Sequence, residues 1–127
     1  MLVARWFLGL GALLGGLAVG LGAFASHGLR EQLSDRALAI FETGVRYQMY
    51  HALALLLVGL WLSRAEAGRS LLTGAGIAYL IGILIFSGSL YVLSLTNIKV
   101  LGAITPLGGV AFIAGWGLLA IAAFTFK

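Results

Sequence analysis

The chain changes character over residues 41–62, FETGVRYQMYHALALLLVGLWL, where a charged and polar segment becomes an uninterrupted apolar run. The apolar part, Tyr47 to Leu62, has sixteen residues, slightly fewer than the ~20 that a membrane-spanning helix needs. Most of the side chains that could take part in chemistry lie in this stretch or just before it. We therefore expect the stretch to enter a bilayer with Tyr47, Tyr50 and His51 near the lipid headgroups, where their polar atoms stay hydrated.

The composition is that of a membrane protein. Hydrophobic residues make up 61% of the 127 residues and charged residues 9%, whereas soluble domains have about 45–50% and 25%. The absence of cysteine excludes a disulfide framework, a thiolate metal site and a cysteine nucleophile. The net charge is +4, but the basic residues are scattered singly, so we expect no nucleic-acid partner.

Charge-free segments predict the fold class. Besides residues 47–62, three runs of twenty or more residues carry no charge, namely 6–25, 71–95 and 106–126. We expect an all-α integral membrane four-helix bundle, a single domain over residues 1–127, in the cell inner membrane if the source is bacterial.

Four spans place both termini on one side of the membrane. The basic residues divide equally between the two sides of the membrane, four on each when Lys127 is counted. Arg5 and the two arginines of the 63–70 loop favour a cytoplasmic location for the termini.

Several local patterns refine this picture. Ser34 is a candidate N-cap, and residues 34–46 have the period of an amphipathic helix. We expect that helix at the membrane surface between spans one and two, with a bend at Gly44. Ala12, Gly16 and Gly20 form a small-residue stripe, and Gly11 and Gly15 make a second pair with the same spacing. The stripe predicts close packing inside the monomer; self-association is the alternative.

The last two spans carry weaker local signals. Residues 86–89, FSGS, are a weak point where the third helix could kink. Thr105 and Pro106 predict an N-cap and a first helical position for the fourth span.

His27 and His51 are the chain's two histidines, and the predicted topology brings both near one membrane face. We expect them to face one polar pocket beneath the surface helix, with Tyr47 or Gln48 beside them. Three interpretations stay open: hydrogen bonds that fix the short helix, a small-molecule or lipid site, or a metal held by two His and a carboxylate. The spacing of known metal motifs is absent.

Sequence motifs for catalysis are missing. No span has an Asp, Glu, Lys or Arg in its middle, which disfavours ion-coupled transport, and no nucleophile elbow or phosphate loop occurs. We expect no enzyme activity and no cofactor. The first function class is an accessory or structural protein that binds a membrane partner or lipid. The second is a binding protein or carrier for a small amphipathic molecule, a quinone or a lipid, at a site drawn from His27, Glu42, Tyr47, Gln48, His51 and Thr105.

Four stretches in chain order carry a family resemblance: GAFASHGL at 22–29, FETGVRYQMYHALALL at 41–56, FSGSLYVLSLT at 86–96 and GAITPLGGVAFIAGW at 102–116. Together they resemble the YgdD/TMEM-type family of small membrane proteins, a family labelled as a domain of unknown function. The resemblance covers almost the whole chain and implies a four-helix membrane protein. It implies no established activity, substrate or cofactor.

Overall fold

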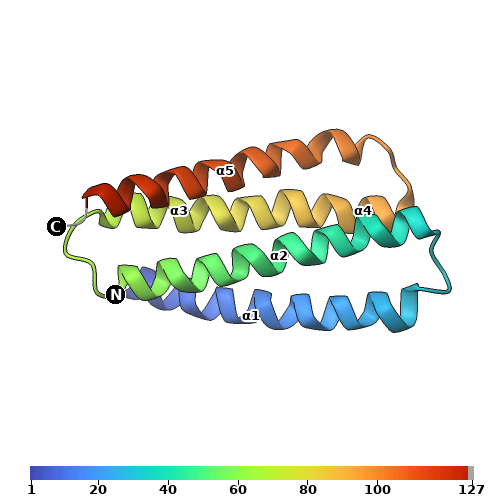
Figure 1. The fold of residues 1–127 in the computed structure, drawn as a ribbon, viewed down its shortest axis with the longest axis horizontal. Coiled ribbons are helices and arrows are strands. Elements are labelled where there is room, and N and C mark those ends of the chain that lie inside the picture. Colours follow the sequence, from blue (N-terminus) through green and yellow to red (C-terminus); the bar gives the residue numbers. More distant parts are fainter. Residues whose placement is uncertain (126–127) are drawn as a thin grey trace.

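The computed structural model describes residues 1–125, which form an antiparallel bundle of four long helical segments. Each is long and apolar enough to cross a membrane. Met1 and the end of the last helix lie at the same end of the bundle (Figure 1). The expected all-α four-helix architecture is confirmed. The segments in chain order are α1 (Leu2–Phe24) with the π turn η1 (Ala25–Leu29), α2 (Asp35–Leu62), α3 (Arg69–Gly82) with the π turn η2 (Ile83–Ser87) and α4 (Gly88–Thr96), and α5 (Leu101–Thr125).

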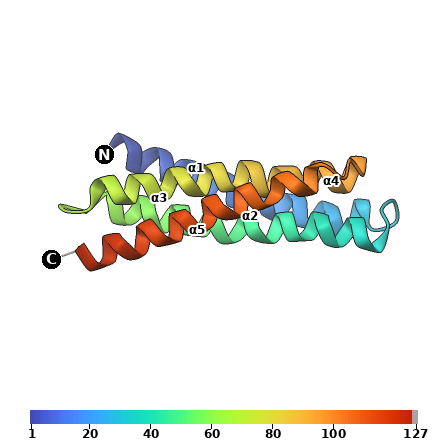
Figure 2. The ribbon, with the colours of Figure 1, turned by 90° about the horizontal axis from the view of Figure 1, so that it is seen from above.

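The centre of the bundle is formed by α2 and the α3–α4 segment, which are the most buried spans. Helix α1 packs on α2 and α5 packs on α3, so α1 and α5 lie at opposite sides (Figures 1 and 2). This arrangement leaves two lateral grooves, one between α2 and α5 and one between α1 and α3. The second groove is lined only by leucine and isoleucine side chains.

Aromatic rings packed on glycines hold the helices together. A Cβ built on the glycine would come within 2.3–2.8 Å of the facing ring in four pairs: Phe7 on Gly76, Phe112 on Gly82, Tyr79 on Gly115 and Tyr91 on Gly44. Lipid gives helices no hydrophobic reason to associate, so close van der Waals contact must supply the attraction. Glycine provides the space for each ring, which accounts for four of the chain's 19 glycines.

Residues 34–46 do not form a separate surface helix, so that expectation is wrong. Ser34 is the N-cap, as predicted, and its Oγ accepts the Ala37 N–H at 3.1 Å, but α2 continues from Asp35 to Leu62 without a break at Gly44. Phe41 and Gly44 are buried, and Ser87 Oγ donates to the Gly44 carbonyl at 2.7 Å. These contacts hold the start of α2 inside the bundle rather than on a membrane surface.

The small-residue stripe of α1 faces outward, so packing inside the monomer is also wrong. A Cβ at Gly16 or Gly20 would meet nothing within 4 Å. The packed face is instead the neighbouring one, where Gly11 lies against Leu56 and the Ala52 carbonyl. Glycines crowd α1 so densely that two helical faces carry small residues, and spacing alone does not distinguish them.

Two details of the last spans also differ from expectation. Helix α5 begins at Leu101, so Thr105 lies inside it rather than at its N-cap, and Pro106 is an interior residue. Residues 100–104 are apolar and too short to cross a membrane by themselves, but residues 101–104 form the first turn of α5 and continue directly into the following apolar run. The irregular point of the third span is the π turn Ile83–Ser87, which overlaps the predicted kink at residues 86–89. Phe126 and Lys127, which entered the predicted span and charge balance, lie outside the described residues.

Candidate functional site

The groove between α2 and α5 is the candidate site. It has a volume of about 500 Å³ and opens sideways from the bundle. Helix α2 contributes two tyrosines and a histidine, whose rings carry polar atoms, and α5 contributes apolar and aromatic side chains. The lining residues are Tyr47, Tyr50, His51, Phe86, Gly109, Phe112, Ile113 and Trp116.

His51 is buried at the inner wall of this groove, and both its ring nitrogens have partners. Nδ1 lies 2.7 Å from the Tyr47 carbonyl, and Trp116 Nε1–H donates to Nε2 at 3.1 Å. A carbonyl can only accept and an indole N–H can only donate, so the two contacts select the neutral imidazole protonated at Nδ1. The ring also stacks on Phe112, with centroids 3.5 Å apart and planes 6° apart. His51 therefore ties α2 to α5, and neither nitrogen is free for a ligand.

The free polar atoms of the groove belong to Tyr47 and Tyr50. Their side chains are 37% and 51% exposed, and within residues 1–125 neither hydroxyl has a hydrogen-bond partner. The two rings meet edge to face at 5.7 Å, and Tyr47 also packs against Phe86 at 4.7 Å. The groove thus presents flat apolar walls with two hydroxyl groups available to a bound molecule.

The shared histidine pocket predicted from the sequence is wrong. His27 is exposed in η1, at the end of the bundle where α2 begins. His51 lies sixteen residues after Asp35, about 24 Å along the helix. Because α2 is one continuous helix, its first turns do not fold back to bring the two rings together.

Two other predicted residues have structural partners away from the groove. Gln48 is buried on the face of α2 toward α1 and α4, where Nε2 donates to the Leu14 carbonyl at 2.8 Å and Oε1 accepts from the Tyr91 hydroxyl at 2.6 Å. Thr105 is buried and shares a 2.6 Å hydrogen bond with Ser89. Both link neighbouring helices.

Glu42 is partly buried and lines neither the groove nor any other cavity described here. Of the six residues predicted for a site, Tyr47 and His51 reach the groove. No cluster of three or more His, Cys, Asp or Glu side chains that could hold a metal occurs in the described part of the chain.

Sequence reasoning missed the aromatic contributions of α3 and α5. Phe112 and Trp116 are four residues apart, and this spacing was a usable signal for one aromatic face. Tyr79 is fully buried with its ring 5.5 Å from His51 and 5.2 Å from Trp116. Its hydroxyl is the one buried side-chain polar atom without a hydrogen-bond partner in the described structure. Buried polar groups are usually hydrogen-bonded, so the unpaired Tyr79 hydroxyl beside His51 is an exception.

The groove lies about halfway along the length of the bundle. The charge-free segments 70–98 and 100–126 have their middles near residues 84 and 113. Phe112 and Gly82, which contact each other at the groove, are within two residues of these middles. A bilayer centred on these two segments places His51 near its midplane, whereas the charge-free segment of α2 itself covers residues 47–63 and begins directly after Arg46. The headgroup level expected for His51 stays a prediction.

Comparison with known proteins identifies relatives but no activity. A family model described as "Protein of unknown function (DUF423)" matches residues 21–109. UPF0382 membrane protein YwdK of Bacillus subtilis (strain 168) is 51% identical over 120 residues, which cover 94% of this chain and 97% of YwdK. UPF0382 membrane protein SAB0533 of Staphylococcus aureus (strain bovine RF122 / ET3-1) is 51% identical over 122 residues, covering 96% and 98%.

A third relative, UPF0382 membrane protein SH2409 of Staphylococcus haemolyticus, is 47% identical over 122 residues, again covering 96% and 98%. No solved structure matches the chain. These names confirm a membrane family of unknown function; they do not carry the YgdD/TMEM label, which stays a prediction. With four membrane-spanning helices and relatives named as membrane proteins, the chain is a multi-pass membrane protein that belongs to the DUF423 family.

Proposed function

We propose that the protein is a non-enzymatic membrane protein that binds a small amphipathic molecule, of the quinone or lipid class, in the groove between α2 and α5. The observation that carries the proposal is a lateral aromatic groove of about 500 Å³ that offers the unpaired hydroxyls of Tyr47 and Tyr50. Small-molecule sites typically have about 300–1,000 Å³, apolar walls and a few polar groups. An opening toward lipid suits a molecule that arrives from the bilayer.

A binding role also fits the chemistry of the groove better than catalysis. A general base must have a nitrogen or oxygen free to take a proton, and both nitrogens of His51 are engaged. The α1–α3 groove is a weaker candidate because leucine and isoleucine line it and give a ligand no polar contact.

Replacing Gly109 by leucine tests the proposal. The position lines the groove, and a Cβ there would meet no atom closer than 3.9 Å, so the new side chain begins without a clash and takes up space in the groove. Gly117→Leu is the matched control, because it makes the same change on the same helix where nothing lies within 4 Å.

Native mass spectrometry of gently solubilised membranes reports the bound molecule. We expect Gly109→Leu to lose a co-purifying lipid or quinone that the wild type and Gly117→Leu both retain. Equal retention by all three proteins would remove the groove as the binding site.

A second candidate function is supported by the outward face of α1. Gly16 and Gly20 have nothing within 4 Å of an added Cβ, and small residues allow close helix association in membranes. An accessory role through self-association or a membrane partner would use this face. Because the chain has no cysteine, a photoactivatable cross-linker on a Gly16→Cys variant would capture the neighbour in native membranes. Gly117→Cys is the control, and equal capture at both positions would argue against a specific α1 contact.

A further inference from the structure

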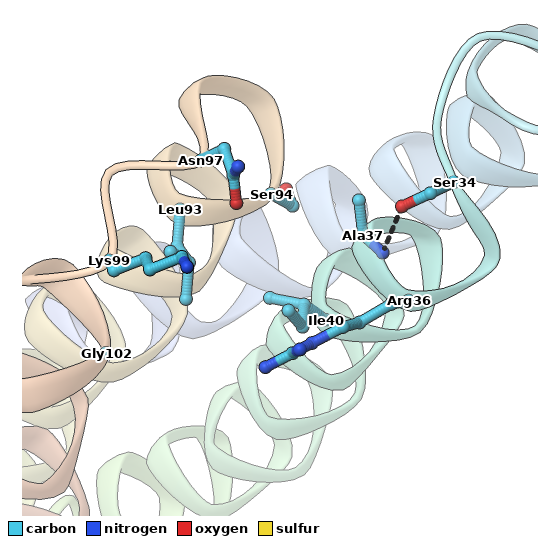
Figure 3. Close-up of a pocket in the computed structure, with 9 residues that line it drawn as sticks. All are labelled: Ser34, Arg36, Ala37, Ile40, Leu93, Ser94, Asn97, Lys99 and Gly102. Carbon is cyan, nitrogen blue, oxygen red and sulfur yellow. Dashed lines mark hydrogen bonds between the residues drawn. The ribbon is translucent and has the colours of Figure 1, made fainter.

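A polar cleft lies at the end of the bundle opposite the chain termini, where α2 begins and the α4–α5 turn closes (Figure 3). Its volume is about 320 Å³. Arg36 extends from the first turn of α2, Lys99 extends from the turn after α4, and both side chains reach into the same gap (Figure 3). Ser94 and Asn97 add polar groups to the wall.

The wall of this cleft carries two cationic side chains and no carboxylate. All four carboxylates of the chain lie in the described region, and none of them lines the cleft. Neither Arg36 nor Lys99 has an ion-pair partner among residues 1–125. The start of α2 adds partial positive charge from its helix dipole. Asp35 lies next to Arg36 in the first turn of α2 and offsets part of that dipole, but it does not line the cleft. Two cations facing a gap with no carboxylate in its wall favour an anion, and guanidinium and ammonium groups are both good phosphate ligands.

The cleft and the aromatic groove lie along the same seam of the bundle. On α2, Arg36 and Ile40 in the cleft fall on the helical face that carries Tyr47 and His51 in the groove. On α5, residue 102 lies in the cleft and residue 109, two turns later, lies in the groove. One elongated molecule lying along the seam would contact both cavities.

The separation matches the dimensions of a lipid. Arg36 and His51 are fifteen residues apart on one helix, about 22 Å. Half of a bilayer that measures about 40–45 Å with its headgroups is also about 20–22 Å. With His51 near the midplane, Arg36 and Lys99 therefore lie at the level of lipid phosphates.

We propose that the Arg36–Lys99 cleft binds the phosphate group of an anionic phospholipid whose acyl chain runs along the α2–α5 seam into the aromatic groove. The inference rests on the proposed binding function and names its ligand class. The cations hold the phosphate, and the groove holds the chain. Quinones lack a phosphate and would leave the cleft unused.

The test compares lipids that differ only in the headgroup. Purified full-length protein in detergent is titrated with dioleoylphosphatidylglycerol, with dioleoylglycerol, which has the same chains without phosphate, and with inorganic phosphate, and occupancy is read by native mass spectrometry. We expect phosphatidylglycerol to bind at least tenfold more tightly than dioleoylglycerol. Millimolar inorganic phosphate should not displace it, because phosphate lacks the chain.

Variants then separate the cleft from the groove. Arg36→Gln/Lys99→Gln should weaken phosphatidylglycerol binding at least tenfold and leave dioleoylglycerol binding unchanged. Arg30→Gln/Arg46→Gln is the matched control, because it removes two charges from the same half of the molecule outside the cleft. Lys99→Gln alone changes one exposed turn residue and should give a partial loss, which keeps the test valid if the double variant does not fold.

Each outcome has a distinct meaning. Unchanged phosphatidylglycerol binding in the cleft variants, with dioleoylglycerol still bound, would overturn the cleft and leave the groove function standing. Binding of neither lipid by the wild type would overturn the lipid assignment, and the groove would then be tested for a quinone by the Gly109→Leu comparison alone. Displacement of phosphatidylglycerol by inorganic phosphate would show a free-anion site and overturn the lipid assignment.

Discussion

Replacing Gly82 by alanine should destabilise the bundle through Phe112. An added Cβ would lie 2.3 Å from Phe112 Cδ1 and 2.4 Å from Cε1, whereas ordinary contacts begin near 3.4 Å. The ring would have to retreat by about 1 Å, the difference between 3.4 and 2.3 Å. The face of the ring stacks on His51 at 3.5 Å, and this contact restricts the retreat. Overpacking of this kind costs about 1–3 kcal/mol.

A glycine-to-alanine change also has a favourable component, which a control can subtract. Alanine stabilises a helix interior by about 0.5–1 kcal/mol relative to glycine. Gly117→Ala should show only that gain, because no atom lies within 4 Å of the new methyl group. The two variants should therefore differ by about 1–3 kcal/mol in unfolding free energy.

The assay is equilibrium unfolding of purified protein in mixed micelles of a mild detergent and sodium dodecyl sulfate, followed by circular dichroism. In a Phe112→Leu background, which removes the ring, Gly82→Ala should cost nothing further. Equal stability of Gly82→Ala and Gly117→Ala would show that the Phe112 ring moves freely, and the contact between Gly82, Phe112 and His51 would not be a fixed element of the site.

Two further predictions use the same assay. Gln48→Leu should destabilise the protein by about 2–4 kcal/mol, because it removes two interhelical hydrogen bonds of about 0.6 kcal/mol each and leaves the Tyr91 hydroxyl unpaired at about 1–3 kcal/mol. Adding Tyr91→Phe to Gln48→Leu should recover part of that loss, and strict additivity of the two changes would contradict the direct bond. His51→Phe should cost about 1–2 kcal/mol, because both ring hydrogen bonds disappear while the ring can still stack on Phe112. An unchanged stability would mean that the Trp116–His51 bond is not formed in the membrane.

The number and limits of the spans could be predicted from the sequence because they depend on the length of each apolar run along the chain and not on its packing partners. A helix in lipid must be about 20 apolar residues long whatever it packs against. Runs free of charge therefore locate α1, α3–α4 and α5 to within a few residues. The start of α2 was misjudged because the same apolar face, with Phe41 and Gly44, suits either a membrane surface or the bundle interior. Only the Tyr91 ring and the Ser87 hydroxyl, both far along the chain, decide between them.

The packing faces could not be predicted because small residues do not mark one face of α1. Gly11 meets a backbone carbonyl of α2, whereas Gly16, on another face, meets nothing. The two glycines are equivalent by residue type and differ only in where the partner helix lies. The histidine pocket was wrong for a related reason. The expected short surface helix would have kept His27 and His51 close together, whereas the continuous helix α2 separates them.

The distribution of paired and unpaired polar groups is what favours the α2–α5 seam as the functional face. Inside the bundle, Gln48, Ser87 and Thr105 all have partners on neighbouring helices. The groups left unpaired along one line are exposed, and a ligand can therefore reach them. The hydroxyls of Tyr47 and Tyr50 and the cations of the Arg36–Lys99 cleft lie along that line, and the opposite groove has no polar groups at all. A molecule with an anionic head and an apolar chain supplies contacts to both parts at once, whereas a purely structural bundle gives no reason for them to share one seam.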